Sequence, residues 1–202
     1  TLFSATIPNE VVKIAAAHMK LPIHVEVAPS GTTVEGVSQE LFIVKRDAKM
    51  RLLGKLLSQY HGSVLLFTRT KFSAGKVARA LKATGQKAAE IHSNRSLGQR
   101  REALDGFKSG RYRILVATDI AARGIDVAGI ELVINFDIPD DAQNYVHRIG
   151  RTARAGRKGR AISFATPDQG LDVKNIEKLI RSAIPVSEHP ELPGEKFLPP
   201  SE

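Results

Sequence analysis

The sequence predicts an α/β fold built on a doubly wound, mostly parallel β-sheet with helices on both faces. Strand-like runs alternate with helix-like stretches along most of the chain, and this alternation is typical of parallel βαβ units. Several strand-like runs are continuously apolar, as expected for a sheet that is covered on both faces. We expect strands at residues 40–44, 64–67, 88–91, 113–117, 132–136 and 161–165, and helices at residues 48–60, 71–84, 97–109, 142–150 and 172–183.

The two ends of the chain differ from this central pattern. Residues 7–21 predict a helix, and residues 23–27 alternate like a strand. Residues 28–36 are small, polar and rich in helix breakers, so we interpret them as a linker. A proline-rich segment from Ile184 to Glu202 follows the last helix, and we expect it to form a loosely held, flexible tail.

The composition is that of an ordinary globular protein with one domain and part of a second. Of the 202 residues, 42% are hydrophobic and 25% are charged. The absence of cysteine fits a reducing compartment, and hence a cytoplasmic protein. No apolar run approaches the about 18 residues that a membrane span needs, so we expect no membrane partner. The first residues carry neither a signal-type core nor an initiator Met, so we expect the chain to begin within a longer protein.

The charge of the chain indicates a polyanionic partner. The net charge is +9 and the isoelectric point is about 9.9. Residues 142–160 contain six cations and no acid, which is a clustered pattern and not a surface of mixed sign. We therefore expect a nucleic acid or a nucleotide to bind near this segment.

Polar residues follow several of the predicted strands at the point where each strand ends. They lie at residues 68–70, at residues 92–94, at Thr118 and Asp119, and at Asp137. Ligands of doubly wound sheets gather at the carboxyl ends of the strands. These residues therefore mark the expected binding edge, although loops after strands are polar in many proteins.

The first group of candidate residues is the segment 117–126, which reads ATDIAARGID. Thr118 offers a hydroxyl that could bind a nucleic-acid phosphate, Gly124 allows close approach of a ligand, and Asp126 could accept a hydrogen bond from a ribose hydroxyl. In the alternative interpretation, Asp119 caps a helix and Arg123 pairs with an acid inside the fold. The residues alone leave both interpretations open.

The second group is the segment 147–154, which reads HRIGRTAR. Its arginines, Arg148, Arg151 and Arg154, advance by three residues and would share one broad face of a helix. Guanidinium groups match phosphate oxygens in shape and charge. The alternative is a solvated basic helix, but Gly150 at its centre disfavours a simple surface helix.

Two absences complete the sequence pattern. No Gly-x-x-x-x-Gly-Lys-[Ser/Thr] loop occurs to bind a nucleotide, and no Asp-Glu pair occurs to hold Mg²⁺. The six histidines are scattered without paired spacing, so we predict no metal site. We infer that the arginines act on a nucleotide that another domain binds.

These segments resemble motifs of DEAD-box ATP-dependent RNA helicases, members of superfamily 2. Residues 117–126 resemble motif V and residues 147–154 resemble motif VI, while residues 66–70 are similar to motif IV and residues 4–6 to motif III. The four occur in the family's order, and the resemblance extends to about residue 185. It implies a RecA-like fold. It also implies four parts: residues 1–27 ending a first RecA-like domain, a linker at 28–37, a second RecA-like domain at 38–185 and the tail at 186–202.

The resemblance implies an ATP hydrolase that unwinds short RNA duplexes, with this chain as its C-terminal half. Arg151 and Arg154 would be arginine fingers on the γ-phosphate, and Gly124 and Asp126 would contact the nucleotide. ATP with Mg²⁺ would be held mainly by the N-terminal RecA-like domain of the same protein, so the chain alone would be inactive as an ATPase. The implied RNA-binding residues are Arg69, Ser93, Arg100, Thr118 and Asp119. The implied coupling residues are Ser4, Thr6, Arg123, His147 and Arg148.

The chain departs from the family pattern at a few positions. Motif VI usually has glycine where this chain has Ala153, and we expect one added methyl on a helix to be tolerated. Leu97 stands where the family often has glutamine, and Ser93 stands where it commonly has glycine. These features suggest a bacterial RhlE-like member.

Two other hypotheses compete with the helicase half. The chain could be a binding module that holds RNA without catalysis, or an interaction domain whose arginines form structural ion pairs. An RNA-only module would more often carry aromatic stacking residues, whereas aromatic residues are only 5% of this chain. We therefore expect contacts to the RNA backbone with little sequence preference.

Overall fold

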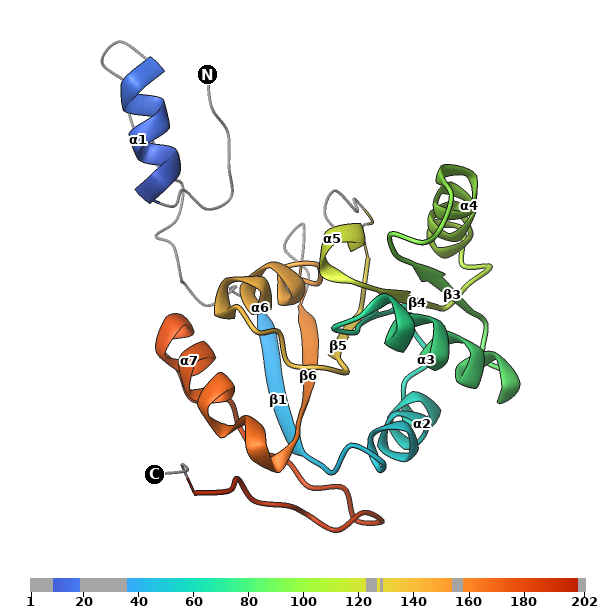
Figure 1. Cartoon of the computed structure of the whole chain (residues 1–202). Coiled ribbons are helices and arrows are strands. Elements are labelled where there is room, and N and C mark those ends of the chain that lie inside the picture. The colour runs from blue at the N-terminus through green and yellow to red at the C-terminus, as the bar shows by residue number, and fades with distance from the viewer. Residues whose placement is uncertain (1–8, 19–35, 123–126, 128, 154–157, 200–202) are drawn as a thin grey trace. The chain divides into compact units, whose positions relative to one another are not determined.

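The computed structural model describes residues 9–18, 36–122, 127, 129–153 and 158–199. The chain divides into two compact units, Thr1–Thr32 and Thr33–Glu202. In the first unit the described element is helix α1 (Asn9–His18), which lies within the helix expected at 7–21 (Figure 1). The strand expected at 23–27 lies outside the described residues, as does most of the expected linker at 28–37.

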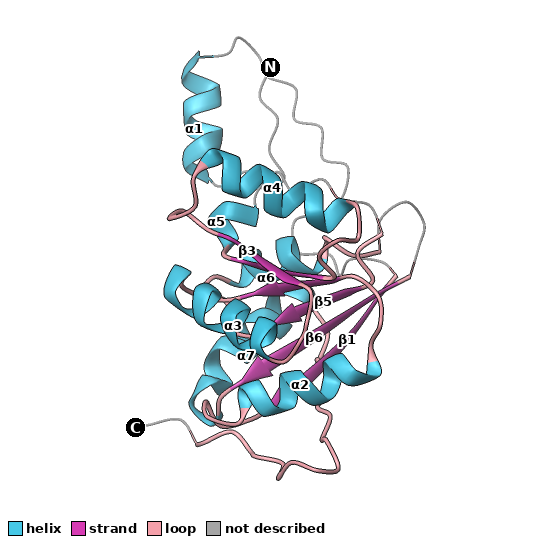
Figure 2. Cartoon of the chain, turned by 90° about the vertical axis from the view of Figure 1, so that its right-hand side faces the viewer, coloured by secondary structure: helices cyan, strands magenta, loops and turns pink. Residues whose placement is uncertain are grey.

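The described part of the second unit forms a six-stranded sheet in which every neighbouring pair of strands is parallel (Figure 2). The strand order β1-β6-β5-β2-β4-β3 places β1 and β3 at the edges. This confirms the doubly wound α/β fold. The strands are β1 (Val37–Ile43), β2 (Val64–Phe67), β3 (Ala88–Ile91), β4 (Ile114–Ala117), β5 (Leu132–Asn135) and β6 (Gly159–Ala165).

Helices cover both faces of the sheet, and each face has its own apolar core. Alternate residues of each strand point to opposite faces, so that Leu66 packs in one core and Leu65 in the other. One face carries α2 (Lys49–Gln59) and α3 (Lys71–Ala83). The other carries α4 (Leu97–Lys108), the single-turn α5 (Asp119–Ala122), α6 (Ala142–Ile149) and α7 (Gly170–Ile180), which follows a short 3-10 helix at Pro167–Gln169.

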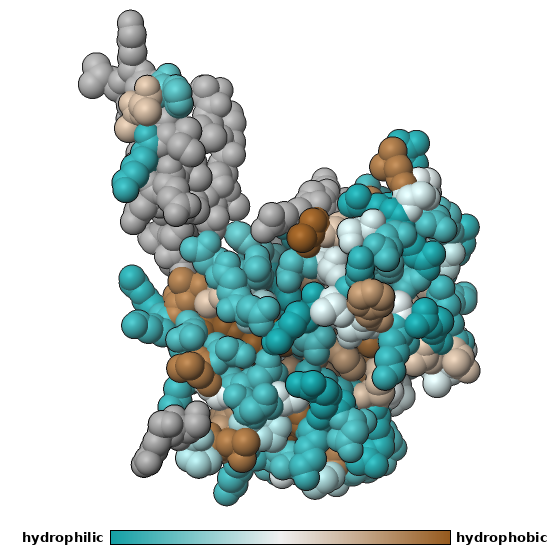
Figure 3. Space-filling view, viewed as in Figure 1, coloured by the Kyte–Doolittle hydropathy of each residue, from teal (hydrophilic) through white to brown (hydrophobic). Residues whose placement is uncertain are grey.

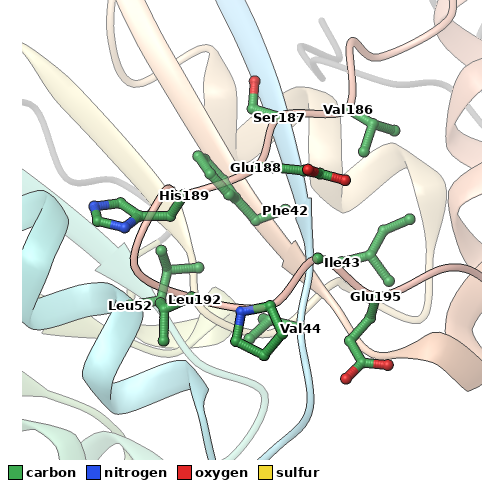
Figure 4. A pocket seen from close by; sticks show the side chains of 12 residues that line it. Phe42, Ile43, Val44, Leu52, Val186, Ser187, Glu188, His189, Leu192 and Glu195 are labelled. Carbon is green, nitrogen blue, oxygen red and sulfur yellow. The ribbon is translucent and has the colours of Figure 1, made fainter.

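The C-terminal segment lies along the edge strand β1. The N–H of Leu41 donates to the carbonyl oxygen of Pro185 (2.9 Å), and the N–H of Ser187 donates to the carbonyl oxygen of Leu41 (2.8 Å). Further along, Leu192 is buried in the core beside α2, next to a cavity of only about 20 Å³ (Figure 4). This docking differs from the loose tail expected from the prolines, because an edge strand offers unpaired backbone groups that a following segment can bind.

We expect Leu192→Ala to lower the free energy of unfolding by about 2 kcal/mol, because it removes buried methyl groups from this core. Thermal unfolding followed by circular dichroism should show a midpoint lower by about 5 °C. The matched control is Val186→Ala in the same segment, whose side chain is 56% exposed and whose loss should change little. Equal midpoints for wild type and Leu192→Ala would mean that the segment does not dock in solution.

Candidate nucleic-acid and nucleotide interface

The carboxyl ends of the strands bring the predicted polar residues to one edge of the sheet. The register pairs Ile91 of β3 with Ala117 of β4, so the residues that follow them, including Ser93 and Thr118, lie at adjoining strand ends. The N–H of Thr118 donates to the carbonyl oxygen of Ile91 (3.4 Å). The expected gathering of polar residues at this edge is therefore confirmed.

An ion pair between a buried arginine and a half-buried aspartate joins the two motif-like segments. The guanidinium of Arg148 makes a bidentate contact with the carboxylate of Asp119, with N–O distances of 2.6 and 2.7 Å. Its remaining nitrogen donates to Oδ1 of Asn135 (3.2 Å) and to the carbonyl oxygen of Asp137 (2.7 Å). The side chain of Arg148 is 1% exposed, and its guanidinium lies 5.1 Å from the ring centroid of Phe67. Arg148 therefore ties α6 to α5, β5 and β2.

This geometry corrects the expectation that Arg148, Arg151 and Arg154 share one face of a helix. Helix α6 ends at Ile149 with Gly150 as its cap, and Arg148 points into the core beside Tyr145 and Ile149. The donors of the Arg148 guanidinium bind acceptors of Asp119, Asn135 and Asp137 rather than an external phosphate. The sequence spacing was misleading because it does not show where a helix ends.

Arg151 lies in the turn that follows α6 and is half-buried. Its backbone N–H donates to the carbonyl oxygen of Arg148 (3.1 Å), and its Nε donates to the carbonyl oxygen of His147 (3.3 Å). Ala153, two residues on, has a φ of 55°, in the left-handed region that glycine adopts without strain. The expectation that this alanine lies on a helix is wrong, and its methyl group costs about 1 kcal/mol in that conformation.

A second buried cation, Lys49 at the start of α2, lies beneath the same edge. Its Nζ donates to the carbonyl oxygen of Phe136 (2.7 Å) and to Oδ1 of Asp137 (3.0 Å). Burial lowers the pKa of Lys49 below its ordinary value, and the Asp137 carboxylate partly offsets that effect. Our sequence interpretation did not identify Lys49 as part of the site, because a lysine at the start of an amphipathic helix is normally solvated.

The predicted RNA-binding residues on this edge retain surface exposure. Arg69 is 43% exposed and binds the loop after β5 through Asp140 (3.1 Å) and the carbonyl oxygen of Ile138 (3.1 Å). Ser93 is exposed, whereas Arg100, in the first turns of α4, and Thr118 are half-buried. Six predicted site residues lie outside the described residues: Ser4, Thr6, Arg123, Gly124, Asp126 and Arg154.

No described group of three or more His, Cys, Asp or Glu side chains could hold a metal ion. In the part of the chain that the structure describes, no helix is long and apolar enough to cross a membrane.

The parallel doubly wound sheet, with an arginine-rich segment tied to its carboxyl edge, is the arrangement expected of a RecA-like helicase domain. Comparison with known proteins agrees. The family described as helicase conserved C-terminal domain matches residues 48–156. The ATP-dependent RNA helicase RhlB of Shewanella baltica is 40% identical over 189 residues, which are 93% of this chain and 43% of that protein.

Solved structures give the same answer. The E. coli DEAD-box protein SrmB, crystallised with RraA, superposes with a TM-score of 0.75 at 36% identity, covering 82% of this chain and 98% of that one. Yeast Dbp5 bound to RNA and ADP BeF3 superposes with a TM-score of 0.81 at 31% identity, covering 91% of this chain and 50% of that one. The chain belongs to the DEAD-box family of RNA helicases, as a C-terminal helicase domain. It spans 43% of the length of the RhlB helicases that it matches.

Proposed function

We propose that this chain supplies half of the active site of an ATP-dependent RNA helicase that separates short RNA duplexes. The observation that carries the proposal is the bidentate Arg148–Asp119 pair, because it joins the motif VI segment to the motif V segment at the carboxyl edge of the sheet. The sequence contains no phosphate-binding loop that could hold a nucleotide alone. The arginines of this edge would therefore act on ATP held by another domain.

On the nucleotide side, Arg151 and Arg154 act as arginine fingers that stabilise charge on the transferred phosphoryl group. Gly124 lets the chain approach the nucleotide, and Asp126 accepts a hydrogen bond from the ribose. The described residues offer no carboxylate cluster for Mg²⁺. The N-terminal RecA-like domain would hold the metal together with ATP.

On the RNA side, Thr118, Ser93, Arg69 and Arg100 bind phosphates and sugars of a single strand, with little dependence on sequence. Asp119 contributes by holding Arg148 rather than by meeting RNA directly, since both of its carboxylate oxygens accept from that guanidinium. A displacement of the motif VI segment on nucleotide binding would be transmitted through the Arg148–Asp119 pair to Thr118, the residue before Asp119. In this way Arg148, with His147, Arg123, Ser4 and Thr6, would couple ATP state to RNA binding.

The predicted domain boundaries at 27, 37 and 185, the cytoplasmic location and the resemblance to RhlE in particular stay predictions. The linker at 28–37 would let the two RecA-like domains close on ATP and RNA. Closure would bend the bound strand and destabilise a short duplex. The N-terminal domain of the same protein is then the obligatory partner of this chain.

The test of this half-site is to compare ATP hydrolysis by the full-length helicase with hydrolysis by this chain alone, each with and without single-stranded RNA. We expect RNA-stimulated turnover only for the full-length protein, because the chain lacks a nucleotide-binding loop. The measurement is phosphate release at saturating ATP. Turnover by the isolated chain would contradict the half-site. Two results together would favour the binding-module hypothesis. The chain alone would bind RNA, and RNA binding by the full-length protein would not change when a nucleotide is added.

A further inference from the structure

A cavity of about 270 Å³ opens between α3 and the loop that joins β3 to α4. It adjoins two predicted RNA-binding residues, Arg69 and Ser93. Lys71 of its wall lies two residues after Arg69, and His92 and Asn94 of its wall flank Ser93 in the sequence. A hydrogen bond from Nζ of Lys71 to Oδ1 of Asn94 (3.0 Å) ties the two walls together. Its walls consist of Lys71, Phe72, Gly75, Arg79, Glu90, His92, Asn94 and Arg95.

The rim of the cavity carries an aromatic ring that the fold does not use. The side chain of Phe72 is 76% exposed and belongs to neither apolar core. The Nζ of Lys71 lies 5.4 Å from the centroid of its ring. Exposed aromatic rings beside cations are the surfaces on which proteins stack single-stranded bases, because every base offers a π-face.

The floor of the cavity carries a buried hydrogen-bond acceptor. Glu90 is 8% exposed, and its Oε1 pairs with Arg95. Its Oε2 accepts no hydrogen bond from any described residue, since Nε2 of His92 is 3.6 Å away. Nε of Arg95 likewise lacks an acceptor among the described residues. Buried polar atoms without partners are costly, so a ligand that supplies a donor to Glu90 and an acceptor to Arg95 would be stabilised at this site.

Gly75 of α3 leaves the space into which this acceptor faces. A Cβ at position 75 would lie 3.2 Å from Oε2 of Glu90 and 3.4 Å from Nη1 of Arg79. The absence of a Cβ at this position keeps the cavity open. It does so at a cost in stability, because glycine in a helix interior is less favourable than alanine. Three cations, Lys71, Arg79 and Arg95, surround one carboxylate, and this balance suits a ligand that carries phosphate.

We propose that this cavity is a base-binding subsite, in which one unpaired nucleobase of the bound RNA stacks on Phe72 and donates its exocyclic amino group to Oε2 of Glu90. The inference rests on the proposed RNA-binding function and adds a base-dependent contact to an otherwise backbone-directed surface. An amino group projects from the edge of adenine, cytosine or guanine and reaches a recessed acceptor. The N3–H of uracil is flanked by two carbonyl oxygens that would face the carboxylate, so uracil binds least well.

The test uses the full-length helicase with a non-hydrolysable ATP analogue and fluorescent oligo(A), oligo(C) and oligo(U), followed by fluorescence anisotropy. We expect wild type to bind oligo(A) and oligo(C) about tenfold more tightly than oligo(U), the size expected of one hydrogen bond to a charged group. Phe72→Ala should weaken oligo(A) binding about tenfold through loss of stacking. Glu90→Gln should bring the affinities for oligo(A) and oligo(U) together.

Gly75→Ala provides a second test that adds a methyl group to the floor of the cavity and improves helix propensity. It should weaken oligo(A) binding without lowering the melting temperature. The matched control is Leu171→Ala on α7, whose side chain is 71% exposed and lies outside the cavity. Its RNA binding should equal that of wild type.

The outcomes separate this inference from the function on which it rests. In one outcome, wild type binds RNA in a manner that depends on the ATP analogue, and the variants Phe72→Ala, Glu90→Gln and Gly75→Ala have the same affinity as wild type for each oligonucleotide. This outcome would overturn the base subsite alone. Failure of wild type to bind any RNA under these conditions would overturn both the subsite and the helicase function.

Discussion

The double variant Arg151→Ala, Arg154→Ala of the full-length helicase is expected to hydrolyse ATP about 10³-fold more slowly than wild type at saturating ATP and RNA. Arginine fingers of other phosphoryl-transfer enzymes contribute on the order of 10³–10⁵ in rate. The Nε and the backbone N–H of Arg151 donate to the carbonyl oxygens of His147 and Arg148 in the last turn of α6, and these contacts restrain the arginine in the absence of a nucleotide. Preorganised charge of this kind acts on the transition state more than on bound ATP. The KM for ATP should therefore change much less than kcat.

The control for this variant is Lys158→Ala, which removes an exposed cation from the same basic segment. Its turnover should stay close to that of wild type. RNA binding and the melting temperature of the double variant must also be measured, because a loss of either would explain slower turnover without arginine fingers. Unchanged turnover in the double variant would assign the basic segment to RNA binding or to structure and would bring the binding-module hypothesis forward.

Much of the fold could be predicted because buried parallel strands leave a strong signal in the sequence. Every predicted strand from residue 40 onward overlaps a strand of the structure, since short apolar runs such as Val64–Phe67, repeated between helix-like stretches, are typical of a sheet covered on both faces. The one-turn helix Asp119–Ala122 was expected only in the alternative interpretation, in which Asp119 caps a helix, because four residues carry no periodicity. β1 begins at Val37, three residues before the predicted start of this strand, and pairs with β6. The sequence did not indicate this extension because Ser38 and Gln39 are polar.

The binding edge was predictable from topology, but the direction of each side chain was not. A basic residue at helical spacing looks the same whether it faces solvent or, like Arg148, fills the core. Glu90 in the otherwise apolar strand Ala88–Ile91 is a signal that the sequence interpretation did not use. An acid within a run that predicts burial indicates a buried charge, and buried charges are rare unless they are paired. Phe72 gave no signal at all, since single exposed apolar residues are common on protein surfaces.

The second large effect concerns stability. We expect Arg148→Ala to lower the free energy of unfolding by about 3–5 kcal/mol, because it leaves the Asp119 carboxylate, the Asn135 amide oxygen and a backbone carbonyl without their donor. The melting temperature of this chain, followed by circular dichroism, should fall by about 10 °C. Arg148→Lys should recover only part of the loss, since an ammonium group cannot reproduce the bidentate contact.

Arg160→Ala is the matched control, because Arg160 also pairs with a carboxylate, that of Glu40 at 2.6 Å, and also lies over a ring, that of Tyr60 at 5.0 Å. Its side chain is 39% exposed, so its removal should cost at most about 1 kcal/mol. The combined variant Arg148→Ala, Asp119→Ala should be less destabilised than the sum of the two single variants, because each removes the partner that the other leaves unpaired. Additive losses would mean that Arg148 stabilises the domain through Phe67 and β5 alone. The motif V and motif VI segments would then be coupled by the sheet between them rather than by their ion pair.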